Sequence, residues 1–446
     1  MWSDWPMFNY KIHIIFLLII LVFSTNVMAQ NNKFVGNWDG AILVNEQKLN
    51  INVTFEMTGN TLIGTIDIPQ QNIFDYPLEI ENIKGKNIIF QMNNVPGNPV
   101  FEGLLEDNQI KGVFKQNNNK LDFSLTKAKV TDKNAVDEIK LKGTEKKVEI
   151  PVEGGKLYGS LTFPKVHDIN DPIAIIIAGS GPTNRNGNSS LIKGKINNLK
   201  DIAYYLSNNS ILTLRFDKRG VGASSSLVDK KTPTFTQYSQ DIINIIEYIN
   251  NNLGRENDQI FLIGHSEGGT LSIMTANEVN NLAGLILLAS PGYKQSTLLY
   301  NQLERQNQRL YQNGKLESPD ILTEALDELI EAIENNKEFD IENYNIPTNF
   351  KNAYVSLNKQ RDFAREWLKT DPAQLLSQIS IPTCIIQGSN DQQVSKGDSL
   401  RLSKAVKDEI ETYKYIDGLN HLLFKDSHQV DNEVLETVLQ FINQYK

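Results

Sequence analysis

Hydrophobic and polar residues alternate with a period of two along residues 33–127 of the chain. In residues 49–57 every odd position is apolar, which is the pattern of a strand buried on one face only. Turn-forming stretches such as 58–60 and 116–119 interrupt the alternation at hairpin spacing and divide it into about eight short strands. We therefore predict an antiparallel β domain, a small barrel or sandwich, over residues 30–130.

The first of these strands opens with Gly36-Asn37-Trp38. This tripeptide resembles the Gly-x-Trp opening of lipocalin-like barrels. We expect Trp38 to close one end of a barrel by packing rather than to contact a ligand.

The pattern changes after the polar residues 131–145, which we interpret as a linker. Beyond it, residues 148–152 and 157–163 have the pattern of an antiparallel pair. Continuous apolar runs then alternate with amphipathic segments such as 238–253, which predicts a mostly parallel eight-stranded sheet with helices on both faces. This α/β domain spans 146–446. The apolar runs are 173–178, 211–216, 260–263, 283–288, 384–386 and 412–416.

One interval of the α/β domain contains no buried strand. Residues 293–375 hold only helix-forming stretches, such as 318–335 and 352–369. An excursion of this size between two core strands predicts a helical cap over the active site.

The N-terminus has the pattern of a signal peptide over residues 1–29. Lys11 precedes the apolar run 12–23, and Val27-Met28-Ala29 would allow cleavage before Gln30. The run is well below the ~20 residues of a bilayer span, although a membrane anchor is the alternative. We expect an exported protein, periplasmic or extracellular in a bacterium.

Composition narrows the function classes. The 446-residue chain has a formal net charge of −9, which argues against nucleic acid and anionic membranes as partners. Its one cysteine, Cys384, lies in an apolar run and is expected in the core. No disulfide within the chain is possible.

The candidate nucleophile is Ser266. It lies in Gly264-His265-Ser266-Glu267-Gly268-Gly269, directly after the apolar run 260–263. Gly-x-Ser-x-Gly between a strand and a helix is the context of a nucleophile elbow. Its glycines, Gly264 and Gly268 among them, let neighbouring backbones pass closely.

A serine nucleophile needs a base, and four histidines follow the predicted signal peptide. His421 lies in a loop between the last predicted strand and the last helix, so we assign it as the base. His167, His265 and His428 are expected to be solvated or capping, with His428 near the start of that helix. Asp391 follows the preceding core strand and is the expected acid. The order Ser266, Asp391, His421 is that of α/β-hydrolases.

Another acidic residue, Asp217, competes for the same role. It follows the strand before the elbow, in Asp217-Lys218-Arg219-Gly220. We interpret this segment as a structural turn with an internal ion pair.

The oxyanion hole needs two amides. We assign those of Ser180 and Glu267, with support from Gly179, Gly181 and Arg185 of the loop after the third core strand. The Glu267 side chain is expected to bond nearby loop groups such as Arg185 or Arg219. The alternative is a contact with substrate or with a substrate amine.

Taken together, these segments resemble the α/β-hydrolase superfamily, in particular its exported bacterial carboxylesterase and serine-aminopeptidase-like branch. The resemblance covers residues 146–446 and rests on 179–187, 217–222 and 264–269. It departs at Ala178, where many members carry histidine. It implies acyl hydrolysis through an acyl-enzyme, without metal or organic cofactor.

We therefore predict an exported serine carboxylesterase that acts on small-molecule esters with short to medium acyl chains. A peptidase or amidase of the same fold is the alternative, with Glu304 or Glu331 of the cap as anchors for a substrate amine. A protein that binds lipid or glycan through its β domain, with a degenerate hydrolase domain, is a further possibility.

Overall fold

The computed structural model describes residues 33–446 except 45–46, 59–60, 69–72, 94, 96, 118, 129–138, 190–194, 228–232, 408–410 and 426–428. The predicted signal peptide and most of the predicted linker lie outside these residues. The chain divides into two compact units, Met1–Lys133 and Asn134–Lys446. No helix in the described part of the chain is long and apolar enough to span a membrane.

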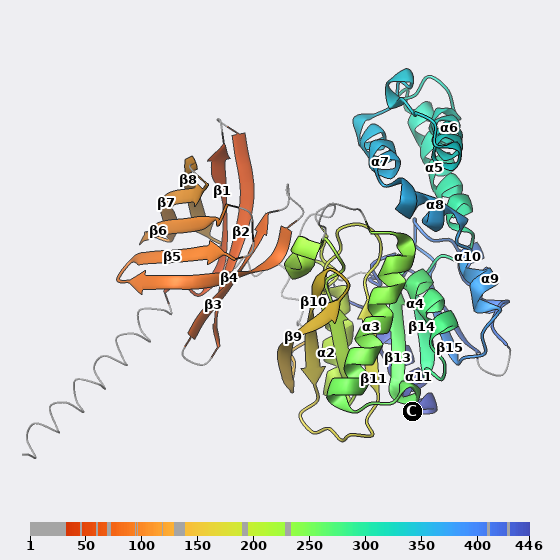
Figure 1. Cartoon of the computed structure of the whole chain (residues 1–446), viewed down its shortest axis with the longest axis horizontal. Helices are drawn as coiled ribbons and strands as arrows, with labels where there is room; N and C mark the ends of the chain where they lie inside the picture. Colours follow the sequence, from red (N-terminus) through yellow and green to blue (C-terminus); the bar gives the residue numbers. More distant parts are fainter. Residues whose placement is uncertain are drawn as a thin grey trace, which may run out of the picture. The chain divides into compact units, whose positions relative to one another are not determined.

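The first unit is a closed antiparallel barrel of eight strands, β1 to β8, each paired with its neighbours in the sequence (Figure 1). The barrel is closed by β1 and β8, which pair from Trp38 with Lys127 to Ile42 with Phe123. The sandwich alternative is therefore wrong. The strands are Gly36–Val44, Gln47–Thr58, Thr61–Ile68, Ile73–Lys84, Asn87–Met92, Val100–Glu106, Gln109–Gln116 and Asn119–Lys127.

Aromatic side chains fill the interior of the barrel. Phe90 stacks on Phe101 at a centroid distance of 4.8 Å, and Phe101 meets Phe123 edge to face at 5.2 Å. Trp38 is fully buried, and its indole Nε1 donates a hydrogen bond of 2.7 Å to the carbonyl of Phe34. Trp38 is thus part of the packed core, as expected.

The second unit is built on an eight-stranded sheet in the order β16-β15-β14-β13-β11-β12-β10-β9. β9 pairs with β10, and β10 with β12, in the antiparallel sense. The six strands β11 to β16 are parallel to one another. β9 begins at Thr144, inside the stretch predicted as linker. The strands are Thr144–Val152, Gly155–Phe163, Ile173–Ile177, Leu212–Phe216, Ile260–His265, Gly284–Leu288, Thr383–Gly388 and Glu411–Ile416.

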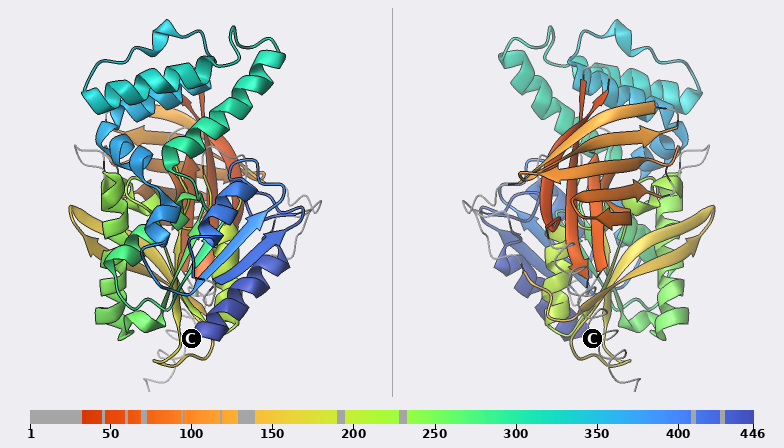
Figure 2. Two further views of the ribbon diagram at one scale, coloured as in Figure 1. Left: turned by 90° about the vertical axis from the view of Figure 1, so that its right-hand side faces the viewer. Right: turned by 90° about the vertical axis from the view of Figure 1, so that its left-hand side faces the viewer.

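Helices cover both faces of this sheet (Figure 2). α3 (Phe235–Leu253), α4 (Glu267–Glu278) and α10 (Lys396–Ser403) pack on one face. α2 (Asn198–Asn208) and α11 (Asn432–Tyr445) pack on the other. Successive residues of β11 belong to opposite cores, which explains why its run is apolar at every position. Two short 3₁₀ helices, Gly222–Leu227 and Asn257–Gln259, complete the connections.

The cap leaves the sheet after the carboxyl end of β14 and returns at β15. Its helices have their own apolar core, centred on Leu326 and Leu329. The stretch 352–369 is helical as predicted, but the chain turns at Gln360 and two helices result. The cap elements are α5 (Gln295–Gln312), α6 (Ile321–Asn335), the 3₁₀ helix Ile341–Asn343, α7 (Thr348–Lys359), α8 (Arg361–Lys369) and α9 (Pro372–Leu376).

Cys384 lies in β15 and is fully buried. Burial raises the pKa of its thiol to about 12. It is a core residue, as predicted.

Candidate active site

Ser266 occupies a strained turn between β13 and α4. Its backbone angles are φ 54° and ψ −125°, a region that a residue with a side chain rarely adopts. The turn is held by hydrogen bonds of 2.9 Å from the Ser266 amide to the Leu288 carbonyl and from the Gly269 amide to the Ser266 carbonyl. The segment has the geometry of a nucleophile elbow.

The glycines of the elbow are required by close packing of backbone. A Cβ on Gly264 would lie 2.4 Å from the backbone of Gly268, and one on Gly268 would lie 2.3 Å from the carbonyl oxygen of Ile177. On Gly269 it would lie 2.0 Å from Ser290 Oγ. The motif therefore follows from steric limits on both sides of the turn.

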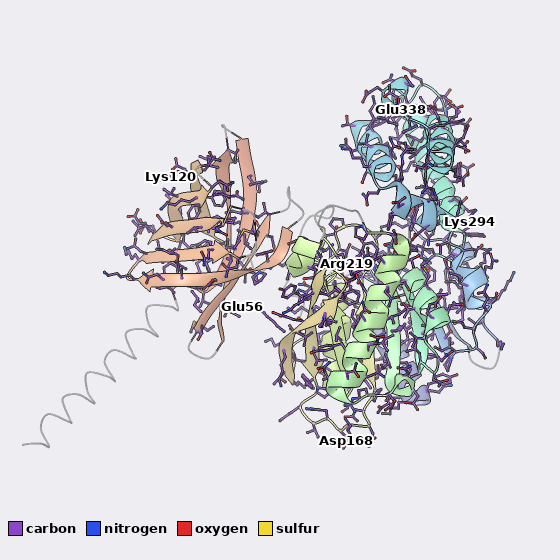
Figure 3. The ribbon with its side chains drawn as sticks, in the orientation of Figure 1. Glu56, Lys120, Asp168, Arg219, Lys294 and Glu338 are labelled. Atoms are coloured by element: carbon purple, nitrogen blue, oxygen red, sulfur yellow. The ribbon has the colours of Figure 1, made fainter. Side chains whose placement is uncertain are left out.

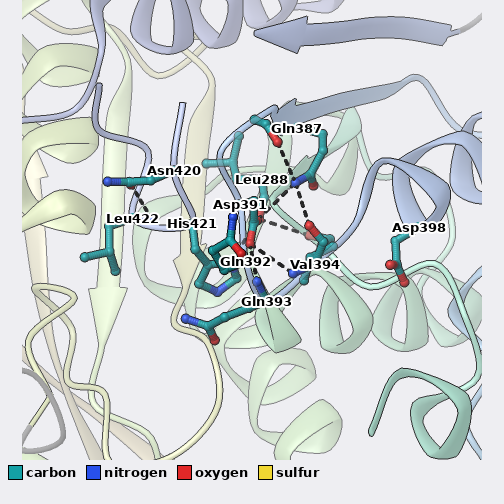
Figure 4. A network of polar contacts seen from close by, with 12 residues as sticks. Leu288, Gln387, Asp391, Gln392, Gln393, Val394, Asp398, Asn420, His421 and Leu422 are labelled. Atoms are coloured by element: carbon teal, nitrogen blue, oxygen red, sulfur yellow. Dashed lines mark hydrogen bonds and ion pairs between the residues drawn. The ribbon is translucent and has the colours of Figure 1, made fainter. Parts of the chain in front are cut away.

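His421 and Asp391 meet at the carboxyl edge of the sheet (Figure 4). Nδ1 of His421 lies 2.9 Å from Oδ2 of Asp391. Both side chains are largely buried, at 11% and 0% exposure. The sequence places these residues in loops after β16 and β15, and the fold brings them into direct contact.

Asp391 is held by four donors. Its Oδ1 accepts from the amides of Gln393 and Val394 at 2.8 and 2.9 Å, and its Oδ2 also accepts from Gln387 Nε2 at 3.0 Å. Burial alone would raise the pKa of this carboxyl, but the bonds from His421 and the two amides bring the pKa below its ordinary value. Asp391 therefore stays ionised and fixes the tautomer of His421 with its proton on Nδ1.

His265 is neither a solvated side chain nor a helix cap, so the expectation of one or the other is wrong. Its ring is buried, with Nε2 2.7 Å from the carbonyl oxygen of His421. Burial lowers its pKa to about 4, with the charge of His421 acting in the same direction. The ring is thus neutral and holds the backbone of the loop that carries His421.

His167 plays no part in this cluster. His167 is exposed and lies against the ring of Phe163 at 5.2 Å. His428 lies outside the described residues, and the last helix begins after it, at Asn432.

The loop after β11 lies directly against the elbow. A Cβ on Gly179 would lie 3.1 Å from Ser266 Cβ. Ser180 follows on the exposed side, and Gly181 takes a positive φ of 67°. The amide of Glu267 is the first of α4, so it has no carbonyl partner within the helix. Both predicted oxyanion donors therefore belong to segments next to Ser266.

Glu267 pairs with neither of the two arginines predicted for it. Its Oε1 lies 3.9 Å from Lys218 Nζ, and both side chains are largely buried. Burial raises the pKa of the Glu267 carboxyl, whereas Lys218 and the indole of Trp367 in α8 lower it. Burial likewise lowers the pKa of Lys218, and Glu267 opposes that shift.

The turn after β12 is structural, but it has no internal ion pair, which corrects the expectation. Asp217 bonds Arg185 instead, through the Arg185 amide at 2.8 Å and Nη2 at 2.5 Å. Arg219, which is labelled in Figure 3, donates two hydrogen bonds to the carboxylate of Asp241 in α3, both of 2.7 Å. The carboxylate of Asp217 is thus engaged away from His421, and Arg185 supports the turn rather than Glu267.

The roles of three residues in the site were not predicted from the sequence. These residues are Lys218, His265 and Gln387. Lys218 donates to the carbonyl of Gly179, far away in the chain. His265 was visible beside the serine, but its partner is the distant backbone of His421. Only Gln387 could have been found from its residue type. It is a polar residue in an apolar strand, and a buried amide side chain needs hydrogen-bond partners.

These groups form an arrangement suited to acyl transfer by a serine nucleophile. A strained serine, an imidazole oriented by a carboxylate and two backbone amides share one edge of the sheet. No group of three or more His, Cys, Asp or Glu side chains that could hold a metal ion is found in the described part of the chain.

The fold and this cluster define an α/β-hydrolase. Residues 193–428 match the family described as "Serine aminopeptidase, S33". The match covers more than half of the chain, which therefore belongs to this family.

Among characterised proteins, the chain is similar to Esterase EstD of Thermotoga maritima, with 27% identity over 278 residues. The alignment covers 62% of this chain, and the chain spans 59% of the length of that relative.

Several solved structures are similar to the chain at low identity. The alpha/beta hydrolase GrgF of a Penicillium species has 19% identity and a TM-score of 0.47, over 68% of this chain and 99% of that one. The proline iminopeptidase of Mycobacterium smegmatis has 16% identity and a TM-score of 0.46, over 67% and 98%. An esterase of Pyrococcus furiosus has 16% identity and a TM-score of 0.44, over 68% and 91%.

Proposed function

We propose that this protein is an exported serine carboxylesterase that cleaves esters with short to medium acyl chains. The observation that carries the proposal is the pairing of His421 with Asp391 at 2.9 Å, at the sheet edge where the half-buried Ser266 occupies a strained turn. The similarity to an esterase supports the choice of ester as substrate.

The reaction would run in two halves. His421 takes the proton of Ser266 as the Oγ attacks the ester carbonyl, and the amides of Ser180 and Glu267 bind the oxyanion. Collapse of this intermediate breaks the bond to the alcohol, which leaves with the proton from His421. Water, deprotonated by His421, then attacks the acyl-enzyme and releases the acid and the serine. Each oxyanion donor would contribute about 3 kcal/mol to the transition state.

An aminopeptidase needs a free carboxylate for the substrate amine, and two of the three residues predicted for this role have a basic partner. The charge of Glu267 is compensated by Lys218. Glu331 is exposed and pairs with Lys337, and Glu304 is exposed on α5. The pairing of Glu267 and Glu331 favours the ester over the aminoacyl substrate.

A lipid- or glycan-binding role for the β domain is also disfavoured. Lipocalin-like binding needs space inside the barrel, whereas its interior is occupied by Phe55, Phe90, Phe101 and Phe123, all buried.

The proposal is tested with p-nitrophenyl butyrate, aminoacyl p-nitroanilides and a fluorophosphonate probe. We expect ester hydrolysis, slower or absent anilide cleavage, and labelling that Ser266→Ala abolishes. A matched control is Ser290→Ala, a serine of the neighbouring loop whose hydroxyl bonds only backbone carbonyls, which should still be labelled. A preference for anilides would contradict the proposal, and so would labelling that persists in Ser266→Ala.

Export is part of the proposal and is supported by the apolar run at residues 12–23. Expression of the full chain in a bacterium, followed by fractionation and N-terminal sequencing, tests it. We expect a product that begins at Gln30 outside the cytoplasm. A full-length cytoplasmic product would contradict export without affecting the chemistry.

A further inference from the structure

The two predicted oxyanion donors come from different segments, and one buried side chain touches both segments. Ser180 follows β11, whereas Glu267 begins α4 after β13. Lys218 follows β12, on the other side of β11 in the sheet. From there it contacts the carbonyl oxygen of Gly179 and lies 3.9 Å from the Glu267 carboxylate. Lys218 thus crosses the end of the central strand.

The carbonyl of Gly179 belongs to the same peptide group as the N–H of Ser180. Because the peptide is planar and trans, these two bonds point in opposite directions. A donor fixed on the carbonyl therefore fixes the direction in which the Ser180 N–H points. A hydrogen bond to the carbonyl also polarises the peptide and strengthens its N–H as a donor.

The Lys218 ammonium is buried, and its neighbours restrict where it can lie. Its side chain is 6% exposed, and it faces the ring of Tyr238 in α3 at 6.0 Å. The other charge that it contacts is Glu267, itself 13% exposed. A buried ammonium must be paired or bonded to be tolerated, and here one partner is the oxyanion loop and the other is the first residue of α4.

We propose that Lys218 is a positioning residue for the oxyanion hole, acting by holding the Gly179–Ser180 peptide with its N–H toward the nucleophile. Glu267 serves as the counter-ion that keeps Lys218 in place. The inference rests on the proposed ester hydrolysis at Ser266 and adds a residue outside the triad.

The principal test compares Lys218→Met with the wild type on p-nitrophenyl butyrate. We expect kcat to fall roughly 10- to 100-fold with KM nearly unchanged, because the amide is misdirected but not removed. The matched control is Lys396→Met, an exposed lysine that also faces a tyrosine ring, that of Tyr415 at 4.4 Å, and it should keep the wild-type kcat.

A second measurement separates positioning from a general structural role. An alkyl trifluoromethyl ketone forms a tetrahedral adduct whose oxyanion lies in the hole. Its Ki should rise in Lys218→Met by about the factor by which kcat falls, whereas KM for the ester should not follow. Equal Ki values in wild type and variant would overturn the inference.

The double variant Lys218→Met/Glu267→Gln removes both buried charges and so avoids an unpaired carboxylate. If the single variant fails to fold, as judged by thermal unfolding, the double variant replaces it in the kinetic comparison. We expect it to remain impaired in kcat, since the Gly179 carbonyl still lacks its donor. Recovery of wild-type kcat would overturn the inference, because Lys218 would then matter only as the partner of Glu267.

Failure of the proposed function is recognised separately. If the wild type is not labelled by the fluorophosphonate probe at Ser266, the proposed function fails and this inference fails with it. If the wild type is labelled and active while Lys218→Met matches it in kcat and Ki, only the inference about Lys218 fails.

Discussion

Nε2 of His265 lies 2.7 Å from the carbonyl oxygen of His421, so the residue before the nucleophile holds the backbone of the base. Since the accepting atom is a carbonyl, the ring must donate, and its proton lies on Nε2. The elbow and the histidine loop are thus joined by a bond that the imidazole of His265 donates from Nε2.

The burial of His265 predicts an acid-sensitive contribution to stability, because it disfavours the charged ring in the folded state. The pKa of His265 is about 4 in the folded state and about 6.5 when unfolded. Between these values the unfolded chain binds the proton more readily, so stability falls as pH decreases. From pH 7 to 4.5 we expect His265 to account for a loss of about 2 kcal/mol. Urea unfolding at both values measures it.

The variant for this test is His265→Gln, whose amide can donate to the same carbonyl but does not titrate. It should lose less stability than the wild type over the same interval. His167→Gln is the matched control, because His167 is exposed, and it should behave as the wild type. An identical pH dependence in His265→Gln and the wild type would refute this prediction.

Asp391→Asn should reduce kcat by about 10⁴ with little change in KM. The amides of Gln393 and Val394 would still find an oxygen, so the loop should keep its shape. The amide side chain cannot stabilise the imidazolium or fix the required tautomer of His421. Steady-state kinetics on p-nitrophenyl butyrate measures the effect.

Gln392→Ala is the control for Asp391→Asn, since its side chain is exposed in the same loop. It should leave kcat unchanged. If Asp391→Asn kept a tenth or more of the wild-type kcat, another group would have to orient His421.

Arg219→Met should destabilise the α/β unit by about 3–5 kcal/mol, because it leaves the carboxylate of Asp241 buried without its partner. Burial already raises the pKa of Asp241 despite Arg219. Arg219→Met/Asp241→Leu should cost less than the single change. Urea unfolding followed by circular dichroism measures both.

The exposed pair of Lys156 and Glu149 provides the comparison. Lys156→Met should leave the unfolding midpoint where it is, since exposed ion pairs contribute little. If Arg219→Met also left the unfolding midpoint unchanged, the buried pair would contribute nothing measurable to the stability of the fold.

Trp38→Ala should destabilise the barrel by about 3–5 kcal/mol, because it empties a fully buried site and removes the bond to Phe34. Ester hydrolysis should be unchanged, since Ser266 belongs to the other compact unit. Calorimetry combined with an activity assay measures both. Leu104→Ala, at an apolar position that is 39% exposed, is the control. Loss of activity in folded Trp38→Ala would show that the units are coupled.

The sequence by itself determined the strands, the order of the α/β core and the three residues proposed for the triad. Period-two alternation and continuous apolar runs reflect which faces of a strand are buried, and this is a local property. The elbow could be recognised because steric limits act between residues only a few positions apart, as between Gly264 and Gly268.

Only the tertiary structure decided the closure of the barrel, since a barrel and a sandwich share the same alternation and differ in the pairing of β1 with β8. It also decided the partners of the buried charges. From charge alone, Arg185 could pair with either Glu267 or Asp217, and in the structure it pairs with Asp217. Lys218 and His265 act through backbone carbonyls that any residue carries, so no residue type in the sequence marks their partners.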